Sequence, residues 1–129
     1  MNIIYKIRKV RHIYLNSLSP MWVFLGKIYR FFAPKIKLKC NQFIGKYGPF
    51  KFDAEFLFSN YSAFGNKHNR GFEHLIRNVR SKNTFFDVGA HIGLVTLPAA
   101  KNMKQNSRII SFEPSLKNFQ HLKSHVENN

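Results

Sequence analysis

Hydrophobic and polar positions follow helical spacing along the first quarter of the chain. Residues 1–18 place apolar side chains at three- and four-residue steps among Lys and Arg, which predicts a basic amphipathic helix. A second helix is predicted to begin at Ser19 and Pro20, because a capping serine followed by a first-turn proline marks a helix start. Residues 21–32 are apolar around most of the helix circumference, and Pro34 ends the pattern.

Alternation with period two comes next. Segments 35–40 and 50–56 both alternate, with glycines and a proline between them, and therefore predict two strands that can pair as a hairpin. The Phe-rich residues 57–64 predict a loop or a short helix against the core. Residues 71–79 predict a short helix, and its apolar face comprises Phe72, Leu75, Ile76 and Val79.

The remainder alternates between strand and helix patterns. Residues 85–88 form a short apolar run, as a buried parallel strand does, and residues 108–112 form a second one. Between them, an apolar helix is expected to start near Ile92 or Gly93, with a distortion at Pro98. A last helix follows, with an apolar face of Leu116, Phe119, Leu122 and Val126. This order of elements predicts an α/β fold.

Residues that could bind a ligand lie where these two strands end. Asp87 and Gly89 close the first strand, Gly93 follows in the turn, and Glu113 comes directly after the second strand. Glycines permit a sharp turn and the close approach of a ligand to the start of the helix. An acidic residue at the end of the second strand is placed to hold ribose hydroxyls. The spacing therefore predicts half of a nucleotide-type cofactor site.

Two cofactor classes use this layout. A dinucleotide site favours G-x-G-x-x-G, whereas residues 89–93 read Gly-Ala-His-Ile-Gly and lack the middle glycine. Asp87 also puts an acid before the turn, which suits a cationic cofactor without phosphate better than a pyrophosphate. We therefore expect S-adenosylmethionine, and an NAD- or FAD-type Rossmann protein remains the enzymatic alternative.

Two blocks carry a resemblance to a known family. They are Phe-Asp-Val-Gly-Ala-His-Ile-Gly at residues 86–93 and Ser-Phe-Glu-Pro-Ser at residues 111–115. The chain from about residue 71 onward resembles the FkbM family of S-adenosylmethionine-dependent methyltransferases at these positions. His91 stands where that family more often has Asn.

The resemblance implies transfer of a methyl group to a hydroxyl of a saccharide or small metabolite. Carried over by position, it implies that the cofactor is bound by Asp87, Gly89, Ala90, His91, Gly93 and Glu113. It implies no catalytic residue in this segment. It further implies a Rossmann-like class I methyltransferase core of which only the first two strands are present, so the chain is expected to be an N-terminal portion, marginally stable and inactive alone.

The expected domains are a basic N-terminal extension, 1–83, made of helices and a β-hairpin, and the truncated cofactor-binding domain, 84–129.

The formal net charge is +15, and residues 1–52 carry eleven Lys or Arg and no acid. Such a block favours an anionic partner, and contact of residues 1–39 with an anionic membrane surface competes with plain packing. A docking module for membranes or nucleic acid is thus the non-enzymatic alternative, with nucleic acid disfavoured because no RNA-binding fold is recognisable.

The single cysteine and two of the histidines bear on localisation and on metal binding. A single cysteine, Cys40, excludes an intramolecular disulfide, and together with the lack of a signal peptide it predicts a cytoplasmic protein that can be peripheral to the membrane. His121 and His125 stand four residues apart on the last helix, a spacing that can share a metal ion. No third ligand is evident in the sequence, so we expect two solvated histidines and no metal site.

Overall fold

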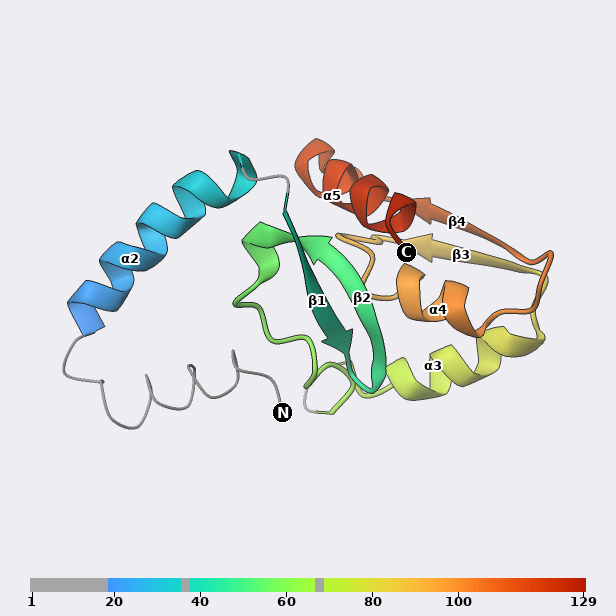
Figure 1. Ribbon diagram of the computed structural model, residues 1–129. Coiled ribbons are helices and arrows are strands. Elements are labelled where there is room, and N and C mark those ends of the chain that lie inside the picture. The colour runs from blue at the N-terminus through green and yellow to red at the C-terminus, as the bar shows by residue number, and fades with distance from the viewer. Residues whose placement is uncertain (1–18, 36–37, 67–68) are drawn as a thin grey trace. The chain divides into compact units, whose positions relative to one another are not determined.

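The computed structural model describes residues 19–35, 38–66 and 69–129 (Figure 1). Its contacts divide the chain into two compact units, Met1–Leu38 and Lys39–Asn129, and each unit is described by itself. The amphipathic helix expected over residues 1–18 lies outside the described residues.

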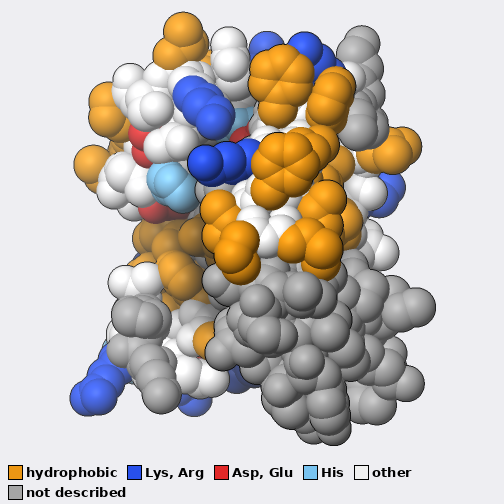
Figure 2. Space-filling model, turned by 90° about the vertical axis from the view of Figure 1, so that its left-hand side faces the viewer, with side chains coloured by type: hydrophobic (Ala, Val, Ile, Leu, Met, Phe, Trp, Pro, Cys, Tyr) orange, Lys and Arg blue, Asp and Glu red, His pale blue; other side chains and the backbone are white. Residues whose placement is uncertain are grey.

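The first unit contains helix α2 (Ser19–Phe32), which continues into a 3-10 turn (Ala33–Lys35). The end of the helix before Pro34 confirms the prediction from that proline, while the predicted start at Ser19 is not tested because the described residues begin there. Apolar side chains are exposed along this helix, and hydrophobic atoms gather over it in Figure 2. They belong to Met21, Val23, Phe24, Leu25, Ile28, Phe31 and Phe32. Contact of this helix with a membrane surface stays a prediction.

The second unit begins with an antiparallel hairpin of β1 (Lys39–Ile44) and β2 (Tyr47–Asp53). The predicted hairpin is confirmed, but its first strand lies four residues later than expected. The inward positions of β2 are Phe50 and Phe52, and they pair with Gln42 and Cys40, so the two buried rings set the register. The alternation of Lys with apolar residues at 35–38, which had predicted an earlier start of this strand, is unrelated to the pairing.

A single apolar core joins the hairpin to the helices that follow. Helix α3 (Phe72–Asn78) runs into a 3-10 turn (Val79–Ser81), as the sequence predicted. The buried core consists of Ile44, Phe50, Phe52, Phe72, Ile76, Val79, Ile92, Leu97 and Ala99. Leu75, expected on the same face, is exposed. The hairpin thus shares one compact unit with residues 84–129, while the division into domains 1–83 and 84–129 stays a prediction.

Parallel strands β3 (Thr84–Val88) and β4 (Arg108–Phe112) are connected by helix α4 (Thr96–Asn102). This β–α–β unit and the hairpin give the described residues two small sheets, and the mixed α/β class is as the sequence predicted. The strand expected at residues 108–112 is confirmed at both ends. The finer assignment, a Rossmann-like methyltransferase core, stays a prediction.

One face of this parallel pair is uncovered. Phe85 and Asp87 point toward the packed side, whereas Phe86 and Val88 are 58% and 81% exposed. The rings of Phe86 and Phe112 stack on this open face with centroids 6.3 Å apart. A parallel strand usually has neighbours on both faces, and a pair of only two strands is expected to leave such residues with too few partners, as the exposure of Phe86, Val88 and Phe112 within the described residues shows.

Proline decides where α4 begins. The helix was expected to start near Ile92 or Gly93, but it starts at Thr96, after a series of turns. Pro98 therefore lies in the first helical turn, where its missing N–H costs no hydrogen bond and its ring meets no preceding helical carbonyl. The expected mid-helix distortion is wrong, because the chain begins the helix late instead of bending it.

Helix α5 (Leu116–Glu127) closes the unit, and Ser115 caps its start by accepting a hydrogen bond from the Asn118 N–H. Its apolar face differs from the prediction. Leu122 is buried, whereas Leu116, Phe119 and Val126 are exposed, and His125 is fully buried in their place. Among the helices that the structure describes, none is both long and apolar enough to cross a membrane.

Candidate functional site

The carboxyl ends of β3 and β4 meet at a tightly bonded turn. The N–H groups of Gly89 and Ala90 both donate to the Phe112 carbonyl oxygen, at 2.9 and 3.0 Å. The Gly93 N–H donates to the Ala90 carbonyl oxygen at 2.8 Å, which closes the turn on itself. The backbone of the turn is therefore fixed against the end of the neighbouring strand.

Glu113 completes this arrangement. Its Oε2 accepts the His91 N–H at 2.8 Å, and its Oε1 accepts the Ser115 N–H at 3.0 Å and the Asn118 amide at 3.3 Å. The bond from Ser115, together with those from His91 and Asn118, lowers the pKa of the Glu113 carboxyl. A carboxylate offers about four acceptor positions, so about one, on Oε2, is left for a ligand.

Backbone conformation explains the residue types in the turn. Gly89, His91 and Gly93 have φ angles of 81°, 52° and 95°, all in the left-handed region. Asn and Gly adopt this region most readily, and His does so more often than bulkier residues. His91 is thus compatible with the turn, because the position requires a left-handed backbone angle and His can adopt it.

An open pocket of about 560 Å³ lies beside the turn. Gly89, Ala90 and His91 form one wall, and Phe72 and Leu75 of α3 contribute to another. A Cβ on Gly89 would meet no atom within 4 Å, so the turn approaches this space without a side chain in the way. The structure therefore brings together three of the expected cofactor residues at a pocket, with Glu113 bonded to one of them.

The other two expected residues have internal contacts. The Asp87 carboxylate is buried and accepts a hydrogen bond from the Thr96 hydroxyl, which also contacts the Ser111 hydroxyl at 3.0 Å. A Cβ on Gly93 would lie 3.2 Å from Leu122 of α5. Neither Asp87 nor Gly93 lines the pocket, and both hold the turn against its neighbours.

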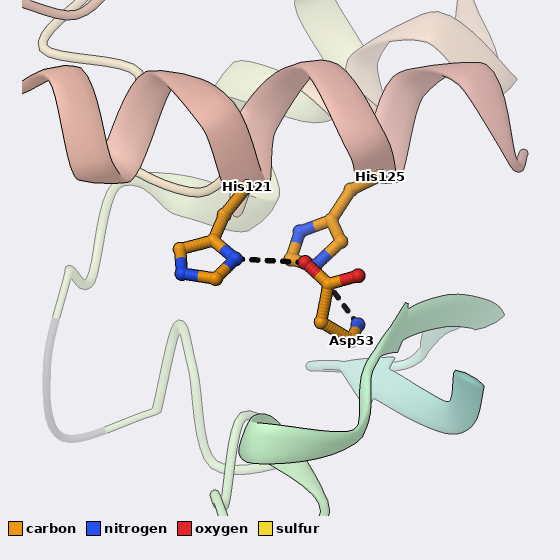
Figure 3. Close-up of side chains that lie close together, drawn as sticks. All are labelled: Asp53, His121 and His125. Atoms are coloured by element: carbon orange, nitrogen blue, oxygen red, sulfur yellow. Dashed lines mark hydrogen bonds and ion pairs between the residues drawn. The ribbon is translucent and has the colours of Figure 1, made fainter. Parts of the chain in front are cut away.

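A second cluster of polar side chains lies where β2 ends against α5. Asp53 Oδ2 is 2.7 Å from His121 Nδ1 and 3.3 Å from His125 Nε2 (Figure 3). The expectation of two solvated histidines is wrong, since His125 is fully buried and the His121 side chain is only 15% exposed. The four-residue spacing pointed to a shared ligand, but nothing in the sequence pointed to Asp53, 68 residues earlier.

Both shifted groups of this cluster have clear physical causes. Burial alone would raise the pKa of Asp53, but hydrogen bonds from Lys39, His121 and Ser124 overcome it and lower that pKa to about 2. Burial lowers the pKa of His125, because it disfavours the imidazolium, and the bond to the Ile92 carbonyl only partly offsets this effect. The folded protein thus favours an ionised Asp53 and a neutral His125.

We expect the stability of the metal-free protein to fall in acid in two stages. Unfolded His125 takes up a proton below about pH 6.5 while the folded form resists it, so stability declines from there. The Asp53 contribution is complete above about pH 4 and is lost toward pH 2. It amounts to about 1–2 kcal/mol, because the partly exposed carboxyl is screened by solvent.

Urea unfolding from pH 7.5 to pH 2.5 measures this effect. Asp53→Asn should flatten the stage below pH 4 and leave the stage near pH 6 in place. A free energy of unfolding that is constant over this range, or the same lower stage in Asp53→Asn, would contradict the assignment.

Comparison with models of protein families, with curated proteins and with solved structures produced no match.

Proposed function

We propose that this chain is the cofactor-binding part of an S-adenosylmethionine-dependent methyltransferase of the FkbM type, with a Rossmann-like core. The observation that carries the proposal is the bond of 2.8 Å between Glu113 Oε2 and the His91 N–H. It links the acid after the second strand to the glycine turn after the first, beside an open pocket. The acceptor in this proposal is a hydroxyl of a saccharide or a small metabolite.

The state of the turn's N–H groups favours this cofactor over a dinucleotide. A pyrophosphate is bound by free backbone N–H groups at a glycine-rich turn. Here the N–H groups of Gly89 and Ala90 donate to the Phe112 carbonyl, and that of His91 donates to the Glu113 carboxylate. These N–H groups are therefore already bonded within the protein, and the Glu113 carboxylate adds a negative charge beside the turn. This arrangement suits a ligand that carries positive charge and no phosphate.

Each residue has a distinct part in the proposed site. Glu113 uses its remaining acceptor position for a ribose hydroxyl, and Gly89 leaves room for the ligand against the turn. The sulfonium of the cofactor supplies an electrophilic methyl group. The turn fixes the cofactor's position, and such positioning in line with an acceptor oxygen provides a large part of the catalysis. Asp87 and Gly93 support the turn from behind.

Isothermal titration of the full chain with S-adenosylhomocysteine tests the proposal. Glu113→Gln should weaken binding about tenfold or more, since hydrogen bonds to a charged group contribute about 1.5–3 kcal/mol. Glu127→Gln is the matched control, because this exposed glutamate at the end of α5 has only a long contact of 3.9 Å with Lys123. Its binding should equal that of the parent chain.

Two results would overturn the assignment. One is equal binding of S-adenosylhomocysteine by Glu113→Gln and the parent chain, with circular dichroism establishing that both are folded. The other is tighter binding of NAD⁺ than of S-adenosylhomocysteine, with the same dependence on Glu113, which would favour the dinucleotide alternative.

A further inference from the structure

We infer that Asp53, His121 and His125 form a binding site for a divalent transition-metal ion. One ligand atom from each residue lies within 4.8 Å of the other two, and Figure 3 shows both imidazole rings extending from α5 toward Asp53. The site joins the end of β2 to α5. It is separate from the proposed cofactor pocket and does not depend on that proposal.

Both imidazoles are held with one nitrogen directed to the cluster and the other occupied. His125 Nδ1 donates to the Ile92 carbonyl oxygen at 2.8 Å, which leaves the lone pair on Nε2 for a ligand. His121 Nε2 lies 2.8 Å from the Glu55 carboxylate, which leaves Nδ1 for a ligand. Metal-binding histidines characteristically donate their other N–H to a carboxylate or a backbone carbonyl. The cluster has both kinds of partner.

The carboxylate is oriented in the same way. Asp53 Oδ1 accepts hydrogen bonds from Lys39 Nζ at 2.6 Å and from the Ser124 hydroxyl at 3.0 Å. Its other oxygen, Oδ2, faces the two histidines. Asp53 thus presents one oxygen to the site while the protein fixes the other, which positions the ligand before an ion arrives.

The spacing of the ligand atoms fits a small cation after the loss of one proton. Bonds of about 2.0–2.1 Å in a tetrahedral site put ligand atoms about 3.3 Å apart. Asp53 Oδ2 and His125 Nε2 are already 3.3 Å apart. The 2.7 Å between Asp53 Oδ2 and His121 Nδ1 is a hydrogen bond, whose proton the ion replaces. His125 Nε2 accepts a hydrogen bond from the Asp53 N–H at 3.0 Å, and the ion takes the place of this bond as well.

The ligand set selects the class of metal. Two imidazoles and one carboxylate suit Zn²⁺ or Fe²⁺, whereas Mg²⁺ and Ca²⁺ prefer oxygen ligands alone. Three protein ligands leave at least one coordination position for water or another small ligand. Because the ligands come from segments 68 residues apart, bound metal would also stabilise the contact between the hairpin and α5.

Titration of the metal-free full chain with Zn²⁺, and with Co²⁺ followed by visible absorption, tests this inference. We expect one ion per chain, a Co²⁺ spectrum of four- or five-coordinate type, and no binding of Mg²⁺ at the same concentrations. His121→Asn should weaken Zn²⁺ binding at least tenfold, because it removes a ligand atom. His74→Asn is the control, because His74 is an exposed histidine of α3 that contacts Asn78.

A second variant keeps the test decisive if His121→Asn fails to fold. Glu55→Gln retains all three ligands and weakens only the partner of His121, so Zn²⁺ binding should fall about 10- to 100-fold. Equal Zn²⁺ affinity in the parent chain and Glu55→Gln, or a Co²⁺ spectrum of purely six-coordinate type, would overturn the inference. The cluster would then be a hydrogen-bonded connection between β2 and α5 without metal.

Discussion

Replacing Phe52 with alanine is expected to lower the free energy of unfolding by about 3–5 kcal/mol, as large-to-small changes in a core do. The Phe52 ring is fully buried and packs against Phe56, Tyr61 and the imidazole of His125, with centroids 6.1, 5.7 and 4.2 Å away. Two of these neighbours follow β2 in the chain and the third belongs to α5, so removal of the ring leaves a cavity between β2 and α5.

Phe43→Ala is the matched control for Phe52→Ala. It removes the same side chain from the same hairpin, but Phe43 is 45% exposed and lies outside the buried core. Urea unfolding should register a loss of less than about 1 kcal/mol for Phe43→Ala. If both variants lost stability equally, the hairpin would not be packed on the rest of the unit as described.

Gly93→Ala is expected to cost about 2–3 kcal/mol of stability. An L-residue at a φ of 95° is strained by about 1–3 kcal/mol. The added Cβ would also approach the Leu122 side chain to 3.2 Å, so this side chain of α5 would have to give by a few tenths of an ångström. Thermal unfolding should therefore give a clearly lower Tm.

Gly71→Ala separates this effect from the general cost of removing a glycine. Gly71 precedes α3 with a φ of −75°, and a Cβ there would meet no atom within 4 Å. We expect its free energy of unfolding to change by less than about 0.5 kcal/mol. A stability of Gly93→Ala equal to that of Gly71→Ala would contradict the backbone strain and the close packing assigned to Gly93.

Local signals in the sequence predicted the elements well. Pro34 located the end of α2, and the short apolar run at residues 108–112 located β4. The β–α–β order followed from the change between strand and helix spacing. Each of these features depends on neighbours a few residues apart, so a linear pattern contains it.

Features that depend on distant partners were missed or misplaced. The register of β1 depends on Phe50 and Phe52 across the hairpin, and the burial of His125 depends on Phe52 and Asp53. The late start of α4 was the exception, because it could be inferred from Pro98: a proline fits the first turn of a helix, whereas a start near Ile92 or Gly93 would have put Pro98 in the second turn. At the carboxyl ends of β3 and β4, the sequence located Gly89 and Glu113 but could not reveal that the N–H groups of the turn after β3 are already bonded.

The placement of α5 has a consequence for the order in which this unit can assemble. Its start is held by the bond from the Ser115 N–H to Glu113, and its end by paired bonds between Lys51 and Asn129, 78 residues apart. During synthesis the hairpin can pair early, but the inner face of β2 lacks its cover until residues 121–129 have left the ribosome. Contacts of such long sequence separation slow folding, so the nascent chain spends that interval with Phe52 and Asp53 still without their contacts to the histidines of α5.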